Sequence, residues 1–119
     1  MFSFPKTYRL LKRQHYNYVA RKGLKFSGRW ICLDVLPNGQ AHCKIGITVT
    51  KRYGDAVARN RFKRLVREAF RLSVANFSTI FALANSYDLI VRPRTQAQQA
   101  NMYDIQHEMV QLLQQAINR

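Results

Sequence analysis

Two stretches of the chain alternate between apolar and polar residues, the pattern of strands that bury one face. They cover residues 29–36 and 41–50. Pro37, Asn38 and Gly39 lie between them and are typical turn residues, so the pattern predicts a hairpin. The residues expected on the buried face are Ile31, Leu33 and Val35 of the first strand, and Cys43, Ile45, Ile47 and Val49 of the second. The opposite face is expected to be open and to offer a binding surface; it carries Trp30, Cys32, Asp34, His42, Lys44, Gly46, Thr48 and Thr50.

Helical periodicity precedes and follows these strands. Residues 9–22 are expected to form a first helix, which Gly23 ends. A second helix is expected from Asp55 to Leu72, with the Asp55 carboxylate at the positive end of the helix dipole. Its apolar stripe, projected at about 100° per residue, consists of Ala58, Phe62, Leu65, Val66 and Ala69. On the far side lies a cationic stripe made of Asn60, Arg64, Arg67 and Arg71.

The last part of the chain is less uniform. Residues 73–87 fit either a continued helix or an ordered loop, whereas residues 88–92 read as a short strand that Pro93 ends. A final helix is expected from Asn101, with Asp104 in its first turn. Its apolar stripe is Met102, Ile105, Met109, Leu112 and Ala116. The predicted fold class is therefore α+β, a small two-layer sandwich in the order α-β-β-(β)-α-β-α, and residues 1–119 form one domain.

Composition narrows the class of protein. The 119 residues include 47% hydrophobic residues, enough for a modest core and too many for a disordered basic tail. No apolar run approaches the roughly 18 residues that span a bilayer, and the first residues lack the pattern of a signal peptide. Two cysteines cannot form a disulfide framework, so a reducing cytoplasm is the expected location.

Charge points to a polyanionic partner. Twenty Lys and Arg against six Asp and Glu give a formal net charge of +14. Residues 1–33 carry eight of these cations and no acid, and residues 51–71 carry eight more beside two acids. Residues 93–119 are neutral and are expected to support the fold. Like charges three and four residues apart destabilise a helix unless something neutralises them, and phosphate would do so.

Residues 51–71 also carry a specific motif. Gly54, Ala56 and Val57 are followed by Arg59-Asn60-Arg61, Lys63-Arg64, Arg67-Glu68 and Phe70-Arg71. In this spacing the chain resembles the protein component of bacterial ribonuclease P. The resemblance extends to Phe4-Pro5, to Arg9-Leu10-Leu11 and to residues 46–51, while the C-terminal quarter fits only by pattern.

The resemblance implies a protein that binds a large catalytic RNA and helps it remove the 5′ leader from precursor tRNA, with Mg²⁺ held by the RNA. It implies a ribosomal protein S5 domain 2-like fold with a left-handed βαβ crossover. It also implies RNA contacts through Lys51, Arg52, Arg59, Asn60, Arg61, Lys63, Arg64, Arg67 and Arg71. The leader would lie in a cleft at Tyr16, Lys44 and Thr48. The family often has Phe at the positions of Tyr16 and Ala20, so one stacking ring is kept and another is absent.

Other functions fit the sequence less well. Three His and two Cys lack zinc spacing, and Cys32 and Cys43 are expected on opposite sides of the sheet, so neither a metal site nor a protein-bound cofactor is predicted. Six dispersed acids do not supply the carboxylate cluster of a protein nuclease, so no catalytic residue is predicted. The main alternative is a non-catalytic RNA-binding protein, such as a ribosomal protein or an assembly factor. A membrane-surface protein is disfavoured because the second helix uses its apolar stripe for packing. The sequence does not indicate an oligomeric state.

Overall fold

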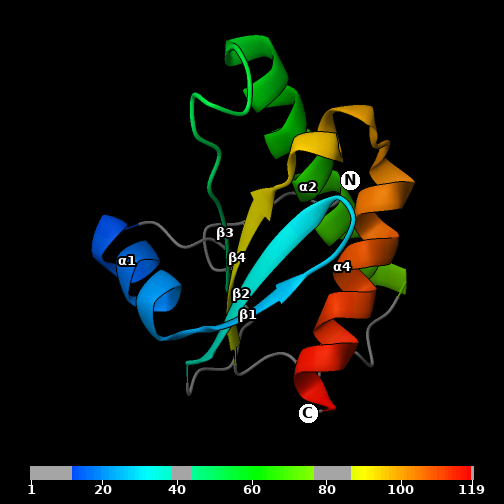
Figure 1. The fold of residues 1–119 in the computed structure, drawn as a ribbon. Helices are drawn as coiled ribbons and strands as arrows, with labels where there is room; N and C mark the ends of the chain where they lie inside the picture. The colour runs from blue at the N-terminus through cyan, green and yellow to red at the C-terminus, as the bar shows by residue number, and fades with distance from the viewer. Residues whose placement is uncertain (1–11, 39–43, 77–86, 119) are drawn as a thin grey trace.

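The computed structural model describes residues 12–38, 44–76 and 87–118 (Figure 1). The helices are α1 (Arg13–Lys22), α2 (Ala56–Asn76) and α4 (Met102–Ile117), with a short 3₁₀ helix, η2 (Thr95–Gln99). The strands are β1 (Leu24–Ser27), β2 (Ile31–Pro37), β3 (Lys44–Ile47) and β4 (Tyr87–Pro93). The predicted α+β order is confirmed, and its optional third strand is β1.

The four strands form one sheet in the order β1-β2-β4-β3. β2 pairs antiparallel with β1 and with β4, while β3 pairs parallel with β4. The expected hairpin between residues 29–36 and 41–50 is therefore wrong, because β4 lies between the two strands. β4 is buried over residues 88–91, as a central strand of a sheet is. The free energy gained by burying this strand between β2 and β3 exceeds the preference of residues 37–39 for a tight hairpin turn. β3, α2 and β4 form the βαβ crossover that the resemblance implies.

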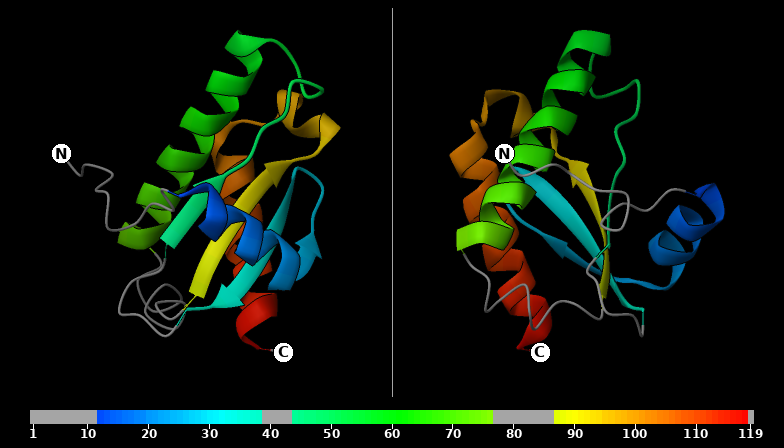
Figure 2. Two further views of the ribbon diagram at one scale, coloured as in Figure 1. Left: turned by 90° about the vertical axis from the view of Figure 1, so that its left-hand side faces the viewer. Right: turned by 180° about the vertical axis from the view of Figure 1, so that it is seen from behind.

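Helices cover both faces of the sheet. α2 and α4 pack side by side against one face, and α1 lies across part of the other face (Figure 2). The polar face is therefore open only in part: Ile90 and Gly46 are buried beneath α1, where Val19 and Tyr16 contact this face.

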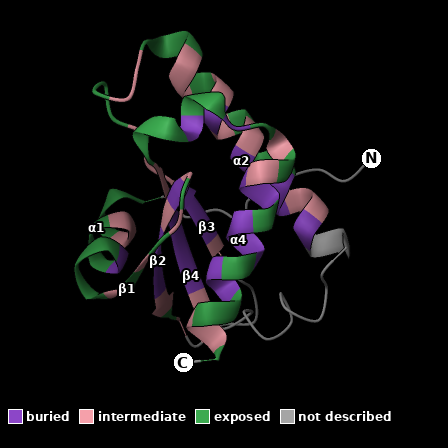
Figure 3. Ribbon diagram, turned by 45° about the vertical axis from the view of Figure 1, so that its right-hand side comes forward, coloured by how far each residue is buried: buried purple, intermediate pink, exposed green. Residues whose placement is uncertain are grey.

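The main core forms between the sheet and the α2/α4 pair, and the inner faces of both helices are buried (Figure 3). The predicted buried face of β2 is confirmed, and Ile45 of β3 is buried as expected, whereas Cys43 lies outside the described residues. Ile47 and Val49 are partly buried against the core. In α2 the predicted stripe is confirmed, with Phe62, Val66 and Ala69 fully buried and Phe70 added at its border. In α4, Ile105, Met109 and Leu112 are buried, and Met102 and Ala116 pack at the edge of the core.

Local signals set most helix ends. Asp55 Oδ1 accepts a hydrogen bond from the N–H of Ala58, which caps α2. Asn101 and Asp104 form a complete capping box at the start of α4. Gly23 follows α1 as predicted but has extended backbone; a side chain there would meet the carbonyl oxygen of Val19 at 2.6 Å. α2 continues to Asn76, beyond the predicted end at Leu72, and residues 77–86 of the ambiguous stretch lie outside the described residues.

The turn between β1 and β2 is held by a carboxylate of α4. Glu108 accepts hydrogen bonds from the N–H groups of Arg29 at 2.8 Å and of Trp30 and Ile31 at 2.7 Å. Gly28 makes room for it, because a Cβ at this position would lie 2.2 Å from the Glu108 carboxyl carbon. The neutral C-terminal segment thus supports the fold, as the charge distribution predicted.

Candidate RNA interface

The cationic stripe of α2 faces away from the core. Asn60, Arg64 and Arg67 are exposed, as the helical projection predicted. Arg71 is partly buried, and its Nη2 lies 2.8 Å from Glu68 Oε2, one turn back on the same helix. Val57 is 77% exposed near the start of the helix. Because the opposite side of α2 is packed on the sheet, this stripe can contact a partner without disturbing the core.

Two other cations of the motif lie elsewhere on α2. The guanidinium of Arg61 donates hydrogen bonds to the carbonyl oxygens of Ala100, at 2.8 Å, and Gln98, at 3.5 Å. Arg61 therefore connects α2 to the C-terminal end of η2 through these two hydrogen bonds. Lys63 is partly buried and lies on the side of α2 that faces β3. Arg59 is also partly buried.

The turn before α2 presents two more predicted cations, because Lys51 and Arg52 are both exposed. Tyr53 follows them, and its ring packs 5.7 Å from that of Phe62. Burial raises the pKa of Tyr53, an effect that the nearby Arg61 cation partly opposes. The Tyr53 hydroxyl is therefore neutral at physiological pH and can donate a hydrogen bond.

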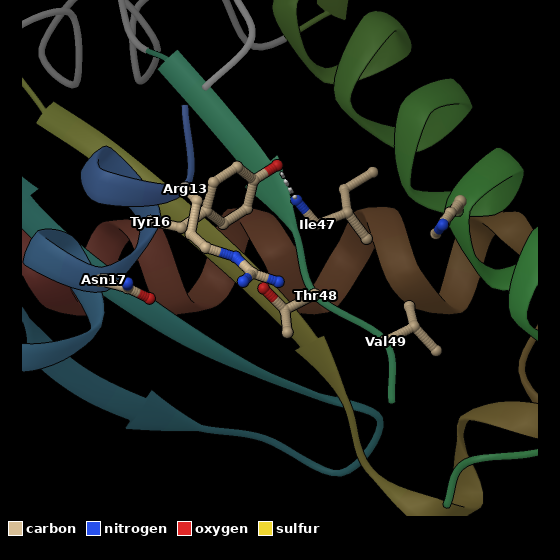
Figure 4. Close-up of a pocket in the computed structure, with 7 residues that line it drawn as sticks. Arg13, Tyr16, Asn17, Ile47, Thr48 and Val49 are labelled. Atoms are coloured by element: carbon tan, nitrogen blue, oxygen red, sulfur yellow. Dashed lines mark hydrogen bonds between the residues drawn. The ribbon is translucent and has the colours of Figure 1, made fainter. Parts of the chain in front are cut away.

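A hollow of about 500 Å³ lies between α1, the end of β3 and α2; we call it the first hollow (Figure 4). It is lined by Arg13, Tyr16, Asn17, Ile47, Thr48, Val49 and Lys63. Of the three predicted cleft residues, Tyr16 and Thr48 meet here. Lys44 is not among the described lining residues; it lies at the opposite end of β3, beside Asp88 of β4.

Arg13, Asn17 and Lys63 were not predicted as cleft residues. Arg13 is one helical turn before Tyr16, so the i,i+3 spacing on α1 could have identified it. Lys63 belongs to a different helix, and only the tertiary arrangement places it here.

Tyr16 is held by the backbone of β3. A Cβ on Gly46 would lie 2.5 Å from Tyr16 Cε1, so the ring rests directly on the glycine. The Tyr16 hydroxyl accepts a hydrogen bond of 3.3 Å from the N–H of Ile47. The next amide, Thr48 N–H, bonds to Val91 of β4, so the Ile47 N–H points away from the sheet. These contacts fix the orientation of the ring at the border of the first hollow.

A second hollow, of about 270 Å³, adjoins the first and shares Thr48 with it. Its described lining residues are Thr48, Thr50, Arg52, Tyr53, Arg92, Pro93 and Thr95. The lining therefore offers two guanidinium groups and three threonine hydroxyls, which are groups that can donate hydrogen bonds to phosphate oxygens. The two hollows are therefore neighbours on either side of Thr48, and both are lined by cations; we call them together the basic path.

α1 is anchored to the sheet by carboxylates near both of its ends. His15 Nε2 lies 2.8 Å from Asp88 Oδ2, and Asn38 donates a 2.7 Å hydrogen bond to the other oxygen of the same carboxylate. At the C-terminal end of α1, Lys25 of β1 bridges the carbonyl oxygen of Ala20 and Asp34 of β2. These contacts join both ends of α1, which lines the first hollow, to the sheet.

The described residues contain no group of three or more His, Cys, Asp or Glu side chains placed to hold a metal ion. Cys32 is partly buried, with its Sγ 3.4 Å from Ser27 Oγ, and the expected opposite placement of Cys43 lies outside the described residues. Among the helices that are described, none is long and apolar enough to cross a membrane.

Comparison with known proteins agrees with the motif. The family model described as Ribonuclease P matches residues 4–117. The ribonuclease P protein component of Chlamydia caviae is 33% identical over 117 residues, covering 98% of this chain and 78% of that protein. The corresponding protein of Desulforapulum autotrophicum is 34% identical over 116 residues, with 98% and 94% covered. The Chlamydia abortus protein is 46% identical over 71 residues, and that match covers 59% of this chain and 51% of the relative, so the chain spans about half of several relatives that it matches.

Solved structures give the same result. The Staphylococcus aureus RNase P protein superimposes with a TM-score of 0.76 at 28% identity, covering 93% of this chain and 96% of that one. The Thermotoga maritima RNase P protein gives a TM-score of 0.76 at 25% identity, covering 90% and 96%. With a family model that covers nearly the whole sequence, and a fold shared with these proteins, the chain belongs to the ribonuclease P protein family.

Proposed function

We propose that this chain is the protein subunit of a ribonuclease P. In this proposal it binds the catalytic RNA and the 5′ leader of precursor tRNA, and it assists the Mg²⁺-dependent cut that produces the mature 5′ end. The RNA carries out the cleavage chemistry, and this chain contributes binding and orientation.

The observation that carries the proposal is the position of the first hollow beside α2. Lys63 lines this hollow and belongs to the same helix as the exposed stripe of Asn60, Arg64 and Arg67. A structured RNA docked on the stripe would therefore lie next to a single strand held between α1 and β3. A single helix would thus connect the catalytic RNA to its substrate.

Docking on the catalytic RNA would use exposed cations on and before α2. Lys51, Arg52, Arg64 and Arg67 are exposed and can reach phosphates, with Asn60 beside them as a hydrogen-bonding group. Arg71 would exchange its contact with Glu68 for a phosphate. Arg61 would act mainly by holding η2 in place, because its guanidinium already donates to two carbonyl groups.

The leader would follow the path formed by the two hollows. The Tyr16 ring offers a stacking surface, and stacking on an aromatic side chain contributes about 1–3 kcal/mol per base. Arg13 and Lys63 line the first hollow and Arg52 and Arg92 line the second, so a strand bound there would meet cations in both hollows. Lys44 would contact RNA only beyond the other end of β3.

The proposal assigns Mg²⁺ to the RNA. Carboxylates are the side chains that Mg²⁺ prefers in proteins, and in the part of the chain that the structure describes no three of them lie together. The two buried carboxylates on the α1 side of the sheet, Asp34 and Asp88, are already paired with Lys25, Arg92 and His15. We place the protein in the cytoplasm, where precursor tRNA is processed in bacteria.

Reconstitution tests this function directly. The purified chain should raise the cleavage of precursor tRNA by a bacterial ribonuclease P RNA at moderate Mg²⁺, and the chain alone should cleave nothing. A variant with both Arg64→Ala and Arg67→Ala should fold and fail to stimulate cleavage. If the wild-type chain binds RNA tightly without stimulating cleavage, the alternative of a non-catalytic RNA-binding protein is favoured. Cleavage by the chain without RNA would contradict the assignment of the chemistry.

A further inference from the structure

A buried carboxylate lies beneath the basic path. Asp34 of β2 is only 1% exposed, and its Oδ1 lies 3.0 Å from Arg92 Nη2 and 3.3 Å from Lys25 Nζ. A negative charge at this place repels a polyanion and so weakens RNA binding. Two contacts of this carboxylate can offset the repulsion.

The first contribution concerns Arg92, which lines the second hollow. A guanidinium has five N–H donors, and the contact with Asp34 uses one nitrogen of the three. Within the described part of the chain, Arg92 Nε is buried and has no hydrogen-bond partner. Arg92 is therefore fixed at one nitrogen, and 38% of its side chain remains exposed. A cation held in this way loses less conformational entropy when it binds a phosphate.

The second contribution concerns α1. Lys25 Nζ contacts Asp34 and also donates a 2.8 Å hydrogen bond to the carbonyl oxygen of Ala20, in the last turns of α1. α1 carries Arg13 and Tyr16, which line the first hollow. Through Lys25, the same carboxylate therefore holds the helix that forms the wall of the first hollow. Its contact with Arg92 holds the guanidinium of that residue in the second hollow.

We infer that Asp34 is a positioning residue for the bound single strand, and this inference rests on the proposed function. Asp34 itself does not touch RNA, because both carboxylate oxygens are buried. It acts through Arg92 and Lys25, which set the place of a phosphate-binding guanidinium and the position of α1. Its effect is specific for the leader, since the cationic stripe of α2 lies on a helix that Asp34 does not contact.

Charge and positioning predict opposite signs for the Asp34→Asn variant, which makes the inference testable. This change makes the protein more positive by one charge, so a purely electrostatic role predicts tighter binding of every RNA. Positioning predicts weaker binding of leader-bearing precursor tRNA. Asp104→Asn is the matched control, because it changes the net charge equally and lies in the capping box of α4, on the opposite face of the sheet from α1.

The measurement is the ratio of the dissociation constants of mature tRNA and precursor tRNA for the reconstituted holoenzyme, at fixed salt and Mg²⁺. We expect Asp34→Asn to lower this ratio several-fold, and Asp104→Asn to leave it unchanged. An unchanged or higher ratio in a folded Asp34→Asn protein would overturn the inference. If the wild-type holoenzyme does not discriminate between the two tRNAs, the proposed function fails instead.

A second variant keeps the test decisive if Asp34→Asn does not fold. Arg92→Gln removes the guanidinium and should lower the same ratio several-fold, and an unchanged ratio in this variant overturns the inference. Where Asp34→Asn folds, the double variant should lose less than the sum of the two single losses, because part of the effect of Asp34 passes through Arg92. Fully additive losses would overturn the inference that Asp34 positions Arg92.

Discussion

The ring of Tyr16 rests on the backbone of Gly46, so closely that a methyl group on the glycine would lie 2.5 Å from the ring. This contact joins α1 to β3 at the border of the first hollow. The ring and the strand are therefore one structural unit, and a change in the glycine is a change in the position of the aromatic surface.

Gly46→Ala should displace the Tyr16 ring. Overpacking of this kind costs about 1–3 kcal/mol of unfolding free energy. Under the proposed function, the displaced ring should also weaken binding of precursor tRNA while leaving binding of the catalytic RNA intact. Thermal unfolding and the two dissociation constants check this. Equal losses for both RNAs would contradict a local effect on the leader.

Tyr16→Phe provides the matched comparison. It keeps the stacking ring and removes the acceptor of the Ile47 N–H, which should cost about 0.5–1.5 kcal/mol of stability. Precursor tRNA affinity should change little. A large loss of leader discrimination in this variant would show that the hydroxyl, rather than the ring, contacts the RNA.

The exposed cations of α2 should determine the salt dependence of binding. If about 6–10 phosphates are neutralised, the affinity for the catalytic RNA should fall by roughly 10³–10⁵ between 50 and 200 mM salt. Arg64→Ala or Arg67→Ala should each lower the logarithmic slope by about 0.9 for the lost phosphate contact, with unchanged thermal stability. Filter binding at several salt concentrations gives the slope. A slope equal to that of the wild type would show that the substituted arginine does not contact a phosphate of the RNA.

Arg61→Ala should behave differently from its neighbours on the same helix. The variant leaves the carbonyl oxygens of Ala100 and Gln98 without a charged donor, so the free energy of unfolding should fall by about 1.5–3 kcal/mol. Urea unfolding of the free protein measures this, with Arg64→Ala as the control. If Arg61→Ala is as stable as the wild type and still loses RNA affinity, Arg61 contacts RNA directly.

Glu108→Gln should destabilise the fold without a direct effect on RNA. Three backbone N–H groups converge on this carboxylate, and an amide has only one oxygen to accept them. We expect a loss of about 1–3 kcal/mol in the free energy of unfolding, measured by urea titration. RNA affinity below the melting temperature should remain within a factor of a few of the wild type. A variant of unchanged stability would show that the turn does not depend on this carboxylate.

The elements that the sequence predicted well are those set by neighbouring residues. The capping box of Asn101 and Asp104 lies within four positions of the chain, and the two sides of α2 follow from helical periodicity alone. Strand pairing is different, because it depends on which strand is buried most completely. Pro37 and Asn38 are turn residues, yet β2 pairs with β4, which is about fifty residues away along the chain. β1 was missed because its apolar-polar alternation spans only four residues, three of which are exposed.

The residues that line the first hollow were also predicted only in part, because they come from separate elements of the fold. Tyr16 and Thr48 were predicted from the resemblance, and both line the first hollow. Lys44 lies on the expected face of β3 but at the end of the strand that is far from the hollow. The cations that line the first hollow with Tyr16 are Arg13 of α1 and Lys63 of α2. Distances between separate elements decided this outcome, and no spacing within the chain encodes them.

The hydrogen bond between Tyr16 and Ile47 also has a consequence for the protein before RNA arrives. β3 is an outer strand of the sheet, and outer strands with free amides can pair with strands of other molecules and aggregate. The hydroxyl of Tyr16 already occupies the outward amide of Ile47, and α1 stands next to this edge. The residue that we expect to hold a base in the assembled enzyme would thus also protect the free subunit from self-association.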